Sequence, residues 1–113
     1  MRSVTLGVSR REESNDRFRS AMEGKSQGAL ITFETPALLF QVLSGERWRL
    51  LEEMLGAGAL FVEDLGARLG RESEPVQRDV DALVRVGILR NHSDGRVEFP
   101  YEALHVDFMV AAA

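Results

Sequence analysis

The chain has 113 residues, 44% of them hydrophobic and 28% charged, which is ordinary for one globular domain with a modest core. The absence of cysteine excludes disulfides, thiol catalysis and cysteine-bound zinc. A net charge of −4 argues against a broadly basic nucleic-acid-binding surface, and no apolar run approaches the roughly 20 residues of a membrane span. We therefore expect a cytoplasmic protein without membrane contact.

The N-terminal segment, residues 1–34, is expected to form a strand-helix-strand extension. Residues 4–8 alternate apolar with polar or small side chains, which is typical of a half-buried strand. Residues 10–25 suggest an amphipathic helix, and residues 29–33 predict a second strand. This extension is either a plain addition to the core or a surface for a partner subunit.

Two helices are predicted next. Thr35 has the chemistry to cap the first, and Ser44 to cap the second, over residues 45–55. Trp48 falls with the apolar residues of the second helix, so we expect it in the core rather than in a binding role. Residues 57–61 are small and apolar and suit a short strand.

A pair of tightly joined helices follows. Gly70 is expected to break the first of them, and Gly66 suggests a place where a neighbouring helix approaches closely. The second covers about residues 74–86, with Ser73 as its cap and Gly87 as its left-handed end.

The exposed face of this second helix admits two interpretations. A helix with Gln77 and Arg78 in its N-terminal half can lie in a DNA major groove, where arginine reads guanine and glutamine reads adenine. The face also places Glu74 four residues before Arg78, and Asp81 four before Arg85. Such pairs stabilise a solvated helix by a few tenths of a kcal/mol each. Both interpretations remain open.

The last part of the chain predicts a hairpin and a terminal strand. Residues 88–90 and 97–99 are expected to pair across an Asp-Gly turn, with Arg90 and Arg96 either gripping phosphates or acting as solubilising residues. Residues 104–110 predict a strand that needs a sheet, formed either with the N-terminal strand of the same chain or across a dimer.

Several segments resemble a known family. LGARLG and VQRDVDALVRVGILR, followed by the hairpin, are similar to the winged helix-turn-helix regulators of bacteria and archaea. The segments FETPALLFQVLSGERWRLLEEML and FPYEALHVDF resemble one group of small predicted transcriptional regulators, over about residues 30–108. The resemblance implies DNA binding and, for some members, an antitoxin that represses its own operon. Gln77 stands where the group often has histidine, which leaves the preferred DNA sequence open.

Together these features predict an α+β fold, with a winged helix-turn-helix over residues 35–100 and a C-terminal strand and tail over residues 101–113. We expect a homodimeric transcription regulator, a repressor or an antitoxin whose terminal elements would hold a toxin. Base contacts are expected from Glu74, Gln77, Arg78 and Asp81. Phosphate contacts are expected around the turn, the second helix and the wing, from Arg68, Arg71, Ser73, Arg85, Arg90 and Arg96.

Two further features bear on other functions, namely protein assembly and catalysis. Residues 44–100 carry eight basic and eleven acidic residues, which favours the alternative of a winged domain used only for protein assembly. The chain has two histidines and no recognised catalytic or phosphate-binding motif, and His105 with Asp107 is more typical of structure than of metal binding. We therefore expect no enzymatic activity, cofactor or metal.

Overall fold

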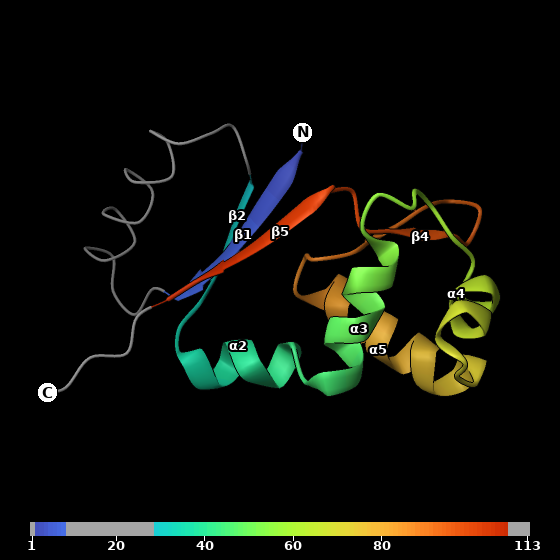
Figure 1. The fold of residues 1–113 in the computed structure, drawn as a ribbon, viewed down its shortest axis with the longest axis horizontal. Helices are drawn as coiled ribbons and strands as arrows, with labels where there is room; N and C mark the ends of the chain where they lie inside the picture. Colours follow the sequence, from blue (N-terminus) through green and yellow to red (C-terminus); the bar gives the residue numbers. More distant parts are fainter. Residues whose placement is uncertain (1, 9–28, 109–113) are drawn as a thin grey trace, which may run out of the picture.

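The computed structural model of the chain describes residues 2–8 and 29–108 and shows an α+β fold (Figure 1). The amphipathic helix predicted over residues 10–25 lies outside the described residues. The described elements, in chain order, are β1 (Ser3–Val8), β2 (Ala29–Phe33), α2 (Pro36–Val42), α3 (Gly45–Met54), α4 (Val62–Leu69), α5 (Ser73–Arg85), β3 (Arg90–Asn91), β4 (Val97–Glu98) and β5 (Ala103–Asp107).

A three-stranded parallel sheet brings the N-terminal and C-terminal strands together (Figure 1). β1 lies in the middle, with β2 on one side and β5 on the other. The C-terminal strand thus pairs with the N-terminal strand of its own chain. The register sets Val4 beside Leu104 and Leu6 beside Val106, so these four side chains share one face of the sheet.

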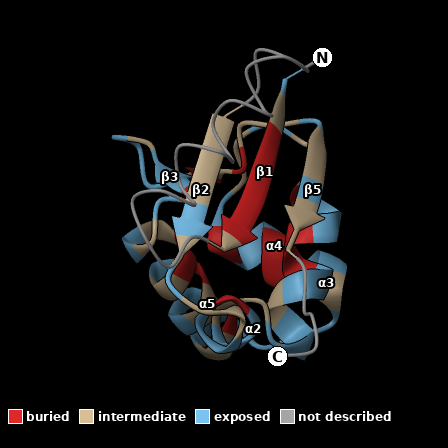
Figure 2. Cartoon of the chain, turned by 90° about the vertical axis from the view of Figure 1, so that its left-hand side faces the viewer, coloured by how far each residue is buried: buried red, intermediate tan, exposed pale blue. Residues whose placement is uncertain are grey.

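That apolar face is part of the main hydrophobic core. Val4 and Leu6 are fully buried, and Figure 2 shows β1 as a buried strand between two less buried neighbours. The same cluster of buried residues continues through the helices to Phe99, the largest of the fully buried side chains. β1 and β5 therefore share one core with the helical part of the chain.

Helices α2 and α3 follow β2 in the chain. The Thr35 side chain caps α2 as predicted, because its Oγ1 accepts a hydrogen bond from the N–H of Leu38 at 3.1 Å. Ser44 holds the corresponding position before α3, but its side chain makes no capping hydrogen bond. α2 contacts β1 and β2 and runs below the sheet in Figure 1.

The prediction that Trp48 is a core residue is wrong. Trp48 is 37% exposed, whereas Leu50, Leu51 and Met54 of the same helix are fully buried. Successive residues are turned by 100° in an α-helix, so Trp48 lies roughly 110° away from the centre of this buried stripe. It therefore flanks the core.

Helices α4 and α5 and the β3-β4 hairpin occupy the end of the molecule away from the sheet (Figure 1). The hairpin strands are shorter than the predicted 88–90 and 97–99. The N–H groups of Ile88 and Leu89 donate to the carbonyl of Leu83 at the end of α5, and the carbonyl of Phe99 accepts from the N–H of Tyr101, so these groups do not pair across the hairpin. The strand predicted over residues 57–61 is reduced to a bridge, in which Leu60 and Val97 exchange two backbone hydrogen bonds of 2.8 Å.

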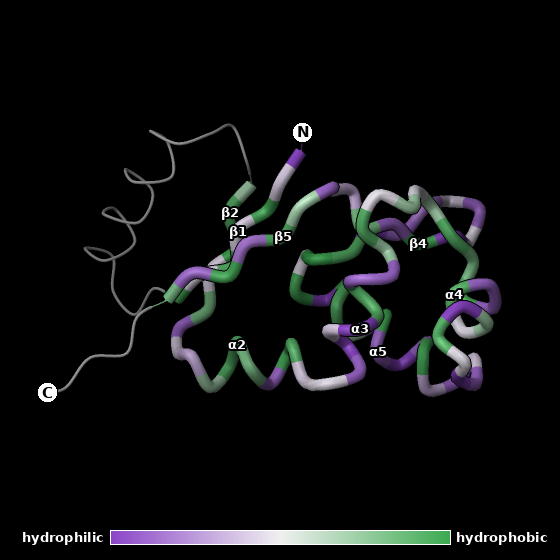
Figure 3. The backbone as a smooth tube through the Cα atoms, in the orientation of Figure 1, coloured by the Kyte–Doolittle hydropathy of each residue, from purple (hydrophilic) through white to green (hydrophobic). Residues whose placement is uncertain are grey.

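Apolar residues recur along the helices and alternate with hydrophilic ones (Figure 3). This pattern is that of amphipathic helices with one side in a core. No helix within residues 2–8 and 29–108 has the length and apolar character needed to cross a membrane.

Candidate nucleic-acid interface

The connection between α4 and α5 is short and closely packed. Gly70 ends α4 in the left-handed conformation, with φ of 66°, and the N–H of Arg71 donates to the carbonyl of Gly66 at 2.9 Å. A Cβ atom at Gly66 would lie only 2.9 Å from the carbonyl oxygen of Arg71. A close approach at Gly66 is confirmed, but its nearest neighbour is the turn before α5 and not the body of another helix, as was predicted.

One side of α5 is buried and the other is exposed. Val76, Val80 and Leu83 face the core. The prediction that Ser73 caps α5 is wrong: Glu72 precedes the helix, Ser73 is its exposed first residue, and no side chain closes its N-terminus. All four residues predicted to contact bases lie exposed on this helix: Glu74, Gln77, Arg78 and Asp81.

The side-chain contacts on this exposed face differ from those of a helix stabilised by internal ion pairs. Gln77 donates to Asp81 at 2.8 Å. Arg78 and Arg85 are exposed, and neither forms an ion pair with a described residue. Arg78 and Arg85 therefore keep their charges available to an outside anion.

The other arginines predicted to contact phosphates have carboxylate partners. These ion pairs are Arg68 with Glu53 at 3.9 Å, Arg71 with Asp79 at 3.0 Å, Arg90 with Glu98 at 3.4 Å, and Arg96 with Asp94 at 2.7 Å. The pairs of Arg68 and Arg90 are long, and both arginine side chains are about half exposed, at 45% and 57%. Exposed ion pairs of this kind contribute little to stability, so exchange of carboxylate for phosphate costs little.

Asp79 organises a half-buried network that the sequence did not indicate. Its carboxylate accepts from Arg47 at 3.2 Å and pairs with Arg71 at 3.0 Å, and the exposed fractions of the three side chains are 17%, 25% and 19%. Arg47 also donates to the carbonyls of Gln41 and Val42 at the end of α2. Asp79 thus ties α5 to α3, to the end of α2 and to the turn before α5.

The hairpin carries a second group of polar contacts. Its turn includes Asp94, whose pKa is lowered by a hydrogen bond from the backbone N–H of Arg96 and by the guanidinium of the same residue. Glu98 lies 2.8 Å from the ring of His92. This hydrogen bond and the one from Arg90 lower the pKa of Glu98, although partial burial acts in the opposite direction. Both arginines of the predicted wing are thus already bonded to hairpin carboxylates.

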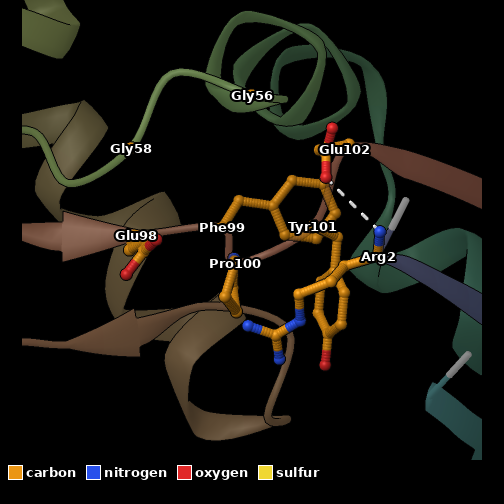
Figure 4. Close-up of a pocket in the computed structure, with 8 residues that line it drawn as sticks. All are labelled: Arg2, Gly56, Gly58, Glu98, Phe99, Pro100, Tyr101 and Glu102. Atoms are coloured by element: carbon orange, nitrogen blue, oxygen red, sulfur yellow. Dashed lines mark hydrogen bonds between the residues drawn. The ribbon is translucent and has the colours of Figure 1, made fainter.

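A shallow pocket of about 240 Å³ lies beyond the hairpin (Figure 4). Arg2 stacks 5.6 Å from the centre of the Tyr101 ring, and its backbone N–H donates to Glu102 at 3.4 Å. Arg2 and Glu102, the charged residues at this end of the pocket, are therefore already in contact with other groups of the chain. These contacts hold the start of β1 against the start of β5.

Ligands for a metal ion do not gather in the described residues: no group of three or more histidine or acidic side chains is found there. His105 and Asp107 lie 3.9 Å apart on β5 without a third ligand.

Comparison with known proteins places the chain in a family. The family model HVO_A0114 matches residues 42–106, more than half of the chain, and the chain belongs to this family. The matched part begins at the end of α2 and continues into β5, so it includes α4, α5 and the hairpin. No curated protein matches the chain. No solved structure matches it either.

Proposed function

We propose that the chain is a winged helix-turn-helix protein that binds double-stranded DNA and regulates transcription, with α5 in the major groove. The main support is the exposed N-terminal half of α5, where Gln77 and Arg78 stand after a short turn and Arg78 has no carboxylate partner among the described residues. Glutamine and arginine at such positions make paired hydrogen bonds to adenine and guanine.

The order of the neighbouring elements also supports this function. α4, a short turn, α5 and the β3-β4 hairpin follow one another as in a helix-turn-helix with a wing. In that arrangement the first helix crosses the DNA backbone and the second enters the groove. Glu74 and Asp81 would add acceptors for the amino group of cytosine.

The surroundings of each arginine suggest separate roles. Arg85 is exposed and without an ion pair among the described residues, so it would hold a phosphate directly. Arg68 and Arg90 would exchange long, exposed contacts with carboxylates for phosphate, and Ser73 would approach a phosphate at the start of α5. Arg71 is mostly buried against Asp79, so its role would be to position α5. Arg96, bonded to Asp94 at 2.7 Å, would keep the hairpin turn in shape.

A second candidate is a winged domain used for protein assembly alone. Four of the predicted DNA-contacting arginines have carboxylate partners, and the net charge is −4. Both observations reduce the attraction of this surface for a polyanion. DNA remains the better candidate because Arg78 and Arg85, on the exposed face of α5, have no ion pair with a described residue.

The two functions are separated by fluorescence anisotropy of the purified protein on duplex DNA from its own upstream region, with a shuffled duplex of equal composition as control. A DNA-binding regulator prefers the upstream duplex, and its affinity falls steeply with added salt as counterions are released. Equally weak binding to both duplexes would overturn the proposal of a DNA-binding regulator and favour the assembly module.

The antitoxin role adds a separate prediction. A gene beside this one would encode a product that arrests growth, and coexpression of this chain would relieve the arrest. A neighbouring gene without toxicity would count against this role without affecting DNA binding.

A further inference from the structure

One edge of the parallel sheet is open among the described residues. β5 pairs with β1 on one side, and no described strand pairs with its other side. Such an edge presents unpaired backbone donors and acceptors that match another strand. The edge is short and has no proline or lysine to block pairing.

Apolar surface continues beyond the end of this strand. Phe108 follows β5 directly, and the ring of Phe40 on α2 stands edge-on to it with centroids 5.2 Å apart. Phe40 is 55% exposed, and Leu38 on the same helix is 42% exposed. A strand added at β5 would therefore meet further apolar side chains beside the edge.

The polar side chains on β5 are complementary to a second, antiparallel copy of the same strand, because an imidazole can donate a hydrogen bond to a carboxylate. The exposed side chains of His105 and Asp107 lie on the polar face of the sheet. In antiparallel pairing, a two-fold axis at Val106 places His105 opposite Asp107 of the partner subunit, and the reverse. An axis one residue earlier sets His105 against itself, and an axis one residue later sets Asp107 against itself.

We propose that two copies of this chain form a homodimer by antiparallel pairing of β5 about a two-fold axis at Val106. The two three-stranded sheets would join into one sheet of six strands. Leu104 would then lie opposite Phe108 of the partner subunit on the apolar face, giving an aliphatic-aromatic pair on each side of the axis. The dimer forms with or without DNA.

The second open edge of the sheet, β2, is less suited to this role. Its sequence ALITF has no charged residue, so nothing on it selects one antiparallel register. On β5, the imidazole of His105 and the carboxylate of Asp107, on either side of Val106, select the register centred on Val106.

Sedimentation equilibrium with exchanged charges tests this dimer. His105→Asp sets carboxylates against each other across the axis, and Asp107→His removes the carboxylate that accepts from His105, so each single variant weakens dimerisation about tenfold. The double variant, His105→Asp with Asp107→His, again sets an imidazole opposite a carboxylate and recovers the wild-type affinity. Circular dichroism checks that each variant is folded. A wild-type monomer, or a double variant no tighter than the single variants, would overturn the proposal.

Cysteine crosslinking tests the register separately, since the natural chain has no cysteine. Val106→Cys lies opposite itself across the axis, so it forms a disulfide-linked dimer under mild oxidation faster than His105→Cys. Thr32→Cys, exposed on β2, is the matched control and stays largely monomeric. Faster crosslinking at Thr32→Cys than at Val106→Cys would show that the chain associates through another edge.

Discussion

Gly66 is a residue of α4 that lies close against the turn before α5. A methyl group there would stand 2.9 Å from a backbone carbonyl oxygen, and backbone cannot give way as a flexible side chain can. Gly66→Ala gains about 1 kcal/mol of helix propensity, but displacement of the turn costs roughly 1–3 kcal/mol. We expect a net loss of about 1 kcal/mol in the free energy of unfolding, measured by urea denaturation.

Gly45 provides the matched control for this substitution. It also lies in a helix, at the start of α3, and a Cβ atom there would meet nothing within 4 Å. Gly45→Ala should leave stability unchanged or slightly raised. Equal effects of the two substitutions would show that the close approach at Gly66 has no energetic importance.

At the level of the elements, the caps of α2 and α3 offer a matched comparison. Thr35 Oγ1 accepts from a helix N–H at 3.1 Å, whereas Ser44 occupies the same position before α3 without such a bond. Thr35→Ala should therefore lower the free energy of unfolding by about 1 kcal/mol. Ser44→Ala should have a clearly smaller effect in the same urea titration. A larger loss of stability for Ser44→Ala than for Thr35→Ala would contradict the assignment of a capping hydrogen bond to Thr35 alone.

The hairpin has a pH dependence that follows from Glu98. Its pKa is lowered in the folded chain, chiefly by the hydrogen bond with His92. Because the pKa of Glu98 is lower in the folded chain, ionised Glu98 stabilises the fold at pH values above its ordinary pKa of 4.5. This contribution is lost as the pH falls through the pKa that Glu98 has in the folded chain.

Urea unfolding from about pH 7 to about pH 3 measures this contribution. Glu98→Gln should lose less stability than the wild type over the acidic part of this range, because the substituted side chain does not titrate. Glu52→Gln, on the exposed side of α3, is the control and should follow the wild type. If the free energy of unfolding falls equally with decreasing pH for the wild type and for Glu98→Gln, the role of this carboxylate is contradicted.

For the whole molecule, the α+β class and the order of the elements could be predicted because local signals mark them. Gly70 and Gly87 both take positive φ where helix ends were expected, and Thr35 caps its helix. The partner of the C-terminal strand could not be chosen from sequence, because alternation fixes which side chains share a face but not which strand lies beside them.

The candidate site was less accessible to sequence reasoning. The exposed face of α5 follows from helical spacing, but the ion pairs depend on tertiary placement. Arg47 and Asp79 are 32 residues apart, and no periodicity links them. Arg71 was expected to contact DNA because the sequence shows that it lies beside the turn. Its contact with Asp79 depends on how α5 packs, which the sequence does not show.

A dimer through β5 would also affect the DNA site that the molecule reads. Two copies related by a two-fold axis would present two α5 helices, and a symmetric protein matches a DNA site with the same symmetry. We therefore expect the preferred duplex to contain an inverted repeat.

The central claim is that the exposed face of α5 reads DNA. Its most direct test is the affinity of the wild type, Arg78→Ala and Arg49→Ala for duplex DNA from the upstream region, by fluorescence anisotropy at fixed salt. Arg49 is the matched control because it is an exposed arginine on α3, roughly 200° around the helix from Arg47, which contacts α5. We predict that Arg78→Ala costs about 1–3 kcal/mol of binding free energy and reduces the preference for the upstream duplex over a shuffled one. Arg49→Ala should bind like the wild type. Equal affinities for the wild type and Arg78→Ala would contradict the assignment of α5 as the recognition helix.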